Sequence, residues 1–230
     1  MEPTGARVTS LNRQFGGAVF DIDGTLLDTL SDIANAANAV LRQHGFPPHP
    51  VSTYRDFVGE GVAVLLTRAL PADRRDPETV RACLQTMQVE YPRHLNETAQ
   101  PYPGIPELIS ELRRRGLRLG ILSNKPDAFA IRCIADFFPE NAFAPVFGLG
   151  PDRPRKPDPA GALEIARRWG LAPGCILYLG DSGTDMQTAV AAGMFPAGVL
   201  WGYRDQAELV GAGAKVLLNT PAQLSALLGI

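Results

Sequence analysis

Two carboxylates separated by one residue, Asp21 and Asp23, have the clearest potential for chemistry in this sequence. They follow the apolar run 18–20, which is typical of a buried strand, and they precede Gly24 and Thr25. Buried carboxylates are unfavourable unless a metal or a positively charged group compensates them. Taken alone, the pair is equally compatible with an acidic turn that caps the following helix, because aspartate favours such positions.

A second acidic pair, Asp181 and Asp185, follows the apolar run 176–180. If the two pairs meet, they offer three or more carboxylate oxygens, the ligands that suit a hard cation such as Mg²⁺. Read alone, either aspartate could instead be a helix cap.

Two further polar groups could bind an anion. Ser123 follows the apolar run 117–122, and its hydroxyl with the backbone N–H of Asn124, near an expected helix start, could hold an anionic oxygen, although serine at such a junction is often only a cap. Lys156 lies in a proline-rich segment that stiffens the backbone, and its ammonium group suits a phosphate or an ionised carboxylate. A solvated surface lysine is the ordinary alternative, but only three lysines occur in the chain.

These groups together comprise a nucleophilic carboxylate, a neighbouring carboxylate, a set of metal ligands, a hydroxyl and an ammonium group. That combination suits phosphoryl transfer, in which positioning and electrostatic stabilisation supply most of the catalysis. A carboxylate nucleophile would give an acyl-phosphate that water can later cleave.

The elements that must position these groups alternate between strand and helix from residue 104 onward, which predicts a parallel sheet covered on both faces. Ligands of such sheets lie at the carboxyl ends of the strands, where all four polar clusters fall. The expected strands cover 117–122, 145–148, 175–179, 197–200 and 215–218, and the expected helices cover 105–115, 127–138, 159–169, 185–192 and 221–228.

Residues 28–100 differ, because they contain three helix patterns and no convincing strand. The patterns cover 29–43, 62–70 and 77–94, and the segment 101–104, with two prolines and a glycine, marks the return. We therefore expect an all-helical module inserted just after the first strand of an α/β protein.

Composition agrees with a soluble globular protein, with 45% hydrophobic and 20% charged residues in a chain of 230 residues. The formal net charge of −2 gives no general attraction to nucleic acid or to an anionic membrane, and no apolar stretch approaches the roughly 18 residues of a membrane helix. Residues 1–14 lack the apolar segment of a signal peptide and are expected to form a loose tail. Cys83, Cys133 and Cys175 have no disulfide or metal-ligand spacing, so we expect buried, reduced thiols in a cytoplasmic protein.

The clusters resemble the motifs of the haloacid dehalogenase superfamily. The matching segments are DIDGT at 21–25, Ser123, Lys156 within RKPDP, and GDSGTD at 180–185, and their order and spacing agree over nearly the whole chain. The resemblance implies a Rossmann-like catalytic core formed by residues 1–27 and 101–230. It also implies that residues 28–100 form a helical cap of type C1.

By the same resemblance, Asp21 is the nucleophile and a Mg²⁺ ligand. Asp23 is the general acid and base, and its backbone carbonyl also binds Mg²⁺. Asp181 is the remaining protein ligand of the metal. Thr25 helps to orient the first loop, and Asp185 supports either Lys156 or metal-bound water.

The phosphate-binding residues that the resemblance implies are Ser123, Asn124 and Lys156, the last of which also pairs with Asp21. Other residues argue against some of the activities found in the superfamily. Dehalogenases lack the second carboxylate of the first motif, which is present here as Asp23. Phosphonate-cleaving members use a cap lysine, and no lysine precedes Lys125 in this chain.

Hexose-phosphate mutases of this type carry an arginine just after the glycine of a cap loop. Here Glu60 and Gly61 follow Gly59, which argues against a mutase, so that a phosphatase remains. The segments that resemble phosphoglycolate phosphatases are 57–61, 65–70, 123–126 and 201–203. In this interpretation the glycine pair, Gly59 and Gly61, lets the cap backbone approach the leaving group closely. Glu60 is unfavourable for an anionic leaving group and favours a neutral or hydroxylated one. Arg68 either meets a substrate carboxylate or is a solvated helix-face arginine.

The sequence therefore predicts a Mg²⁺-dependent phosphatase for small phosphate monoesters that acts through an aspartyl-phosphate, with 2-phosphoglycolate as the first candidate. A sugar phosphate, a nucleotide and pyrophosphate are alternative substrates. A phosphotransferase or mutase and a phosphoryl-binding module without turnover are the other classes left open. We expect a monomer or homodimer whose partner is a small phosphorylated molecule, with no nucleic acid or membrane involved.

Overall fold

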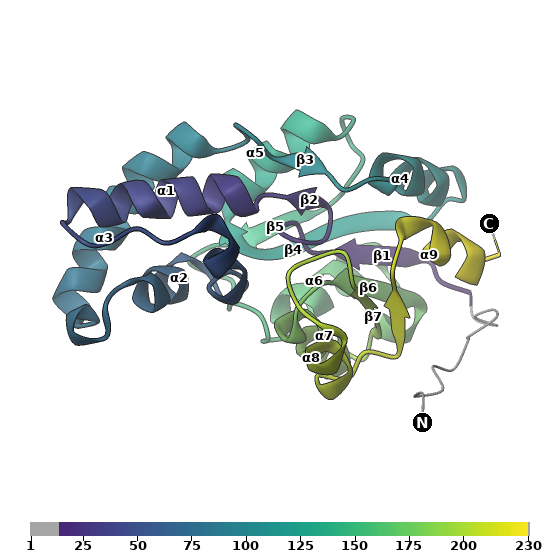
Figure 1. The fold of residues 1–230 in the computed structure, drawn as a ribbon. Helices are drawn as coiled ribbons and strands as arrows, with labels where there is room; N and C mark the ends of the chain where they lie inside the picture. Colours follow the sequence, from purple (N-terminus) through teal and green to yellow (C-terminus); the bar gives the residue numbers. More distant parts are fainter. Residues whose placement is uncertain (1–13, 230) are drawn as a thin grey trace, which may run out of the picture.

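The computed structural model describes residues 14–229, so the expected N-terminal tail, apart from its last residue, lies outside the described residues. Six strands form one parallel sheet, and β1 lies in its interior between β4 and β6 (Figure 1). This sheet confirms the predicted α/β class. In spatial order the strands are β5 (Val146–Leu149), β4 (Arg118–Pro126), β1 (Gly17–Phe20), β6 (Ile176–Gly180), β7 (Phe195–Val199) and β8 (Val216–Leu218).

Helices cover both faces of the sheet, and the two faces have separate hydrophobic clusters. On β1, Ala18 and Phe20 join one cluster and Val19 joins the other, because successive side chains of a strand point to opposite faces. The first cluster includes residues of α4 (Ile105–Arg114), α5 (Asp127–Phe137) and α9 (Pro221–Leu227), and the second includes residues of α6 (Ala160–Trp169) and α7 (Gly183–Ala191). The uninterrupted apolar character of β1 follows from this burial on both sides.

Strand β4 extends beyond the expected range 117–122 and reaches Pro126, with an irregularity in its pairing after Leu122. Helix α5 begins at Asp127, as expected, but Asn124 belongs to β4 and not to a loop between the strand and the helix. Residues 123–125 are polar, so an apolar pattern does not reveal them as strand, yet all three are buried. The short helix α8 (Gln206–Gly211) was also not predicted.

Three helices lie between two very short strands, β2 (Leu27–Asp28) and β3 (Gln100–Pro101), which pair antiparallel where the chain leaves the sheet region and returns. The two-residue strands are too short for a pattern to predict. The helices are α1 (Leu30–Gln43), α2 (Val62–Ala69) and α3 (Pro77–His94), with 3₁₀ turns at Val51–Asp56 and Ala72–Arg74. In Figure 1 these helices lie beyond one end of the sheet, away from both chain termini. Their position leaves the carboxyl ends of the central strands facing the helices.

Two of the three cysteines, Cys83 and Cys133, are buried as expected. Cys175 is exposed, which corrects the expectation, because it ends the 3₁₀ turn Pro173–Cys175 before β6 rather than lying within the strand. Within residues 14–229, no helix is both long and apolar enough to span a bilayer.

Candidate active site

The carboxyl ends of two adjacent strands, β1 and β6, bring Asp21 together with the second acidic pair. Asp21 follows β1, and its backbone N–H continues the pairing with β6 through a 3.0 Å hydrogen bond to the carbonyl of Leu179. Asp181 follows β6, and Asp185 lies in the first turn of α7. Asp21, Asp181 and Asp185 are all buried, and each has a carboxylate oxygen within 4.8 Å of the others.

Lys156 enters this cluster from the segment between β5 and α6. Its Nζ lies 2.6 Å from Oδ1 of Asp185 and 3.1 Å from Oδ1 of Asp21, and its side chain is 2% exposed. Burial opposes the charge of Lys156, but the carboxylates of Asp185 and Asp21 hold its pKa well above the ordinary value. Asn124 fixes the lysine backbone, since its Oδ1 accepts from the Lys156 N–H at 2.8 Å and its Nδ2 donates to the Lys156 carbonyl at 3.2 Å.

Asp185 has a structural partner, Ser182, in addition to Lys156. Its Oδ2 accepts hydrogen bonds from the hydroxyl of Ser182 at 2.6 Å and from the backbone N–H of Ser182 at 3.2 Å. Ser182 accepts in return from the backbone N–H of Asp185, which completes a capping box at the start of α7. Asp185 is therefore a helix-capping residue and an ion-pair partner of Lys156 at once, so the two interpretations of this residue are compatible.

The donor set fits a hard divalent cation. Burial raises the pKa of Asp21 to about 6, although Lys156 opposes this shift, and burial together with the charges of Asp185 and Asp21 raises that of Asp181 well above the ordinary value. Oδ1 of Asp21 lies near Lys156, yet the contact lacks hydrogen-bond geometry, and among the described buried side-chain atoms this oxygen alone has no hydrogen-bond partner. Oxygen ligands with uncompensated negative charge are what Mg²⁺ binds.

The backbone of the loop 21–25 allows the carboxylate of Asp181 to lie close to Gly24. Gly24 has φ +80°, and a Cβ at this position would collide with the carboxylate of Asp181. Thr25 donates a long hydrogen bond of 3.4 Å to Oδ1 of Asp181, and the backbone N–H of Tyr203 donates to Oδ2 at 2.8 Å. Only glycine satisfies both the conformation and the space at position 24.

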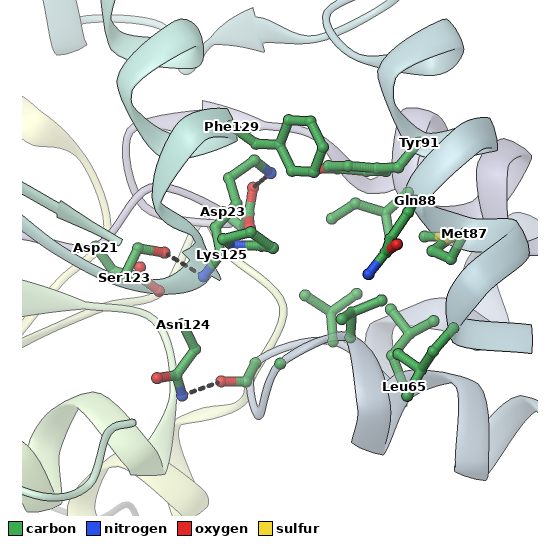
Figure 2. Close-up of a pocket in the computed structure, with 17 residues that line it drawn as sticks. Asp21, Asp23, Leu65, Met87, Gln88, Tyr91, Ser123, Asn124, Lys125 and Phe129 are labelled. Atoms are coloured by element: carbon green, nitrogen blue, oxygen red, sulfur yellow. Dashed lines mark hydrogen bonds and ion pairs between the residues drawn. The ribbon is translucent and has the colours of Figure 1, made fainter. Parts of the chain in front are cut away.

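Asp23 lies on the other side of the loop and has its own cation. Its Oδ1 accepts from Nζ of Lys125 at 2.7 Å (Figure 2) and from the hydroxyl of Thr29 at 2.6 Å. The side chain of Lys125 is 2% exposed and that of Asp23 is 13% exposed. No role for Lys125 was predicted from the sequence. Two signals could have indicated one, namely the scarcity of lysine and the position two residues after Ser123.

A cavity of about 220 Å³ connects these groups to the helices between β2 and β3. Figure 2 shows Asp21, Ser123 and Asn124 on one side of it and Leu65, Met87 and Gln88 on the other. The complete lining is Asp21, Asp23, Ile33, Val58, Gly59, Gly61, Val62, Leu65, Leu84, Met87, Gln88, Tyr91, Ser123, Asn124, Lys125, Pro126 and Phe129. The cavity is thus polar at the sheet and largely apolar at the helices.

Of the four loop and helix residues that the sequence associated with the leaving group, Gly59 and Gly61 line this cavity, whereas Glu60 and Arg68 do not. Glu60 and Arg68 form an ion pair with each other and line a second cavity of about 280 Å³, together with Ser182. The arginine also donates to the backbone carbonyl of Asp56 at 3.3 Å.

Three side chains of the sheet region hold the loop that contains Gly59. Asn124 Nδ2 donates to the Gly59 carbonyl at 3.0 Å, Arg155 donates to the Glu60 carbonyl at 3.2 Å, and Arg204 donates to the Val58 carbonyl at 2.7 Å. The loop is therefore closed over the site in this structure.

Comparison with known proteins assigns the class. The family model of haloacid dehalogenase-like hydrolases matches residues 15–193, so the chain belongs to this family. It is 34% identical over 190 residues to a phosphoglycolate phosphatase of Pseudomonas putida, an alignment that covers 80% of this chain and 69% of that protein. It is 33% identical over 196 residues to a phosphoglycolate phosphatase of Nitrosospira multiformis, covering 81% and 84% of the two chains. A solved structure from Lactobacillus delbrueckii subsp. bulgaricus superposes with a TM-score of 0.88 at 30% identity and covers 94% of this chain and 100% of that one.

Proposed function

We propose that this protein is a Mg²⁺-dependent phosphatase that hydrolyses small phosphate monoesters through an aspartyl-phosphate at Asp21. The observation that carries the proposal is the buried cluster of Asp21, Asp181 and Asp185 at the carboxyl ends of β1 and β6, in which Asp21 and Asp185 contact the ammonium group of Lys156. The names of the relatives support 2-phosphoglycolate as the first substrate to test.

In the first half-reaction the carboxylate of Asp21 attacks phosphorus, and the bond between phosphorus and the ester oxygen breaks. Asp23 gives its proton to the departing alkoxide, which leaves as the alcohol. Ser123, Asn124 and Lys156 hold the phosphoryl group. Bound Mg²⁺, held by Asp21, Asp181 and the backbone carbonyl of Asp23, would supply positive charge that offsets the charge of the phosphoryl oxygens.

In the second half-reaction a water molecule attacks phosphorus, and Asp23 accepts a proton from it. The bond between Asp21 and phosphorus breaks, which releases inorganic phosphate and restores the carboxylate. Thr25 and Asp185 support these steps by positioning, because the first contacts Asp181 and the second holds Lys156 at 2.6 Å.

We further propose that residues 28–100 act as the cap and that residues 1–27 and 101–230 form the catalytic core. The loop held by Asn124, Arg155 and Arg204 would exclude water from the aspartyl-phosphate while the alcohol is still bound. Glu60 and Arg68 would then influence specificity indirectly, by fixing the backbone of this loop through the contact with Asp56.

A panel of phosphate monoesters, assayed for phosphate release with Mg²⁺ and with EDTA, tests the proposal. We expect metal-dependent release from small esters and none from the Asp21→Asn variant. The absence of metal-dependent release from every ester would refute the phosphatase assignment. Transfer of phosphate to an added sugar in preference to water would indicate a phosphotransferase instead.

A further inference from the structure

The cavity beside Asp21 and Asp23 contains one positively charged side chain among its described lining residues, that of Lys125. Its Nζ lies 2.7 Å from Asp23 Oδ1 and 5.1 Å from the centre of the Tyr91 ring. Figure 2 shows the lysine and Asp23 beside the rings of Tyr91 and Phe129. The ammonium group is therefore buried, held by a carboxylate and an aromatic face, and adjacent to the space that a leaving group would occupy.

The rest of the cavity offers nothing that could neutralise an anionic leaving group. The helices contribute apolar side chains and the amide of Gln88, and Arg68 is paired with Glu60 at the other cavity. A carboxylate that enters an apolar cavity without a cation loses its hydration and gains no partner. Among the described residues, Lys125 is thus the group that could receive one.

The position of Lys125 also limits where that carboxylate can be. A general acid must lie within one hydrogen bond of the ester oxygen, and Lys125 lies within one hydrogen bond of the general acid. The path from the ester oxygen through Asp23 to the ammonium group comprises two hydrogen bonds of roughly 2.8 Å each and the width of one carboxylate, so the two atoms lie no farther apart than about 8 Å. A carboxylate joined to the ester oxygen through a single carbon, with its own hydrogen bond of roughly 2.8 Å to the ammonium group, reaches about 6 Å and fits within this limit. An ammonium group has three donors, so it can bind Asp23 and the substrate together.

We propose that Lys125 determines substrate specificity by binding the carboxylate of the leaving group, and that the preferred substrates are phosphate esters of 2-hydroxy acids. This inference rests on the proposed phosphatase function. It assigns the recognition of the acid to a residue of β4, in the sheet, and not to a cation of the helices.

The test compares 2-phosphoglycolate with its uncharged amide, 2-phosphoglycolamide, in the same Mg²⁺-containing assay. A charge-assisted hydrogen bond to the carboxylate predicts a kcat/KM for the acid about 10- to 100-fold above that for the amide. Lys125→Met should bring this ratio close to one, and Lys125→Arg should retain part of it. Lys215→Met is the matched control, because it removes an exposed cation that does not line the cavity, and it should leave the ratio unchanged. With wild-type protein, adding one methylene between the ester oxygen and the carboxylate should lower kcat/KM about tenfold or more.

Two results would overturn the assignment while the phosphatase remained established. If Lys125 only orients Asp23, the Lys125→Met variant would slow the acid and the amide by the same factor and preserve their ratio. If the apolar wall dominates, wild-type protein would hydrolyse the amide at least as efficiently as the acid, a result that needs no variant. Loss of metal-dependent release from all esters would instead refute the proposed function itself.

Discussion

Replacing Lys156 by methionine tests the electrostatic account of the site most directly. The lysine side chain is 2% exposed, and its Nζ lies 2.6 Å from Asp185 and 3.1 Å from Asp21. Methionine retains most of the side-chain volume but leaves both carboxylates without their cation. Removing one partner of a buried ion pair destabilises a protein by about 3–5 kcal/mol, because the remaining charge stays buried.

For a chain of 230 residues, that loss corresponds to a decrease in Tm of roughly 6–20 °C. Turnover should fall at least about 10²-fold, as it does when a donor that stabilises developing charge is removed. Thermal unfolding in EDTA and a phosphate-release assay with Mg²⁺ measure the two effects. The matched control is Lys215→Met, since Lys215 is exposed and should change stability by less than about 1 kcal/mol. A Lys156→Met variant as stable and as active as the Lys215→Met variant would refute this account.

Three further predictions concern the first loop. Asp21→Asn should abolish phosphate release while circular dichroism remains that of the wild type, and retained turnover would exclude Asp21 as the nucleophile. In metal-free protein, the pKa of Asp21 is raised to about 6 from 3.8, so the folded state binds this proton more tightly than the unfolded state. Its contribution to the unfolding free energy is present at low pH and declines as pH rises from about 4 to 6, and Asp21→Asn should remove that decline in urea titrations. Gly24→Ala should lower the unfolding free energy by about 1–3 kcal/mol, because its Cβ would displace Asp181. The same displacement should lower the affinity for Mg²⁺, which calorimetry measures. An unchanged affinity would contradict the close approach of Asp181 to Gly24.

The sequence predicted the sheet well because its strands are buried on both faces and therefore read as apolar runs. The prediction of strands failed where the buried residues are polar. Residues 123–125 continue β4 although all three are polar, since each finds a buried partner that the sequence does not reveal. The two-residue strands β2 and β3 form only because the helical segment returns to its starting point.

The candidate site likewise contains residues that the local sequence indicates and contacts that only the folded structure reveals. The local sequence indicated that Asp21 and Asp181 lie at strand ends, because each directly follows an apolar run. The pairing of Lys125 with Asp23 joins residues 102 positions apart, and it depends on how the ends of β1 and β4 align. The sequence left Arg68 either to meet a substrate carboxylate or to be solvated, whereas in the structure this residue of α2 forms an ion pair with Glu60. The sequence shows which residues are cationic, whereas the packing of the folded chain determines which anion each of them contacts.

The charges of the site explain the positions of two of the three lysines in the chain. Four carboxylates, those of Asp21, Asp23, Asp181 and Asp185, meet two ammonium groups, those of Lys125 and Lys156, which leaves a net charge of minus two when all are ionised. One divalent cation neutralises that charge. The two ammonium groups are not interchangeable, because Lys156 contacts Asp21 and Asp185 whereas Lys125 contacts Asp23 beside the cavity. A phosphate ester with a second anionic group would therefore meet a separate cation at each end, which a single lysine shared by both acidic pairs could not provide.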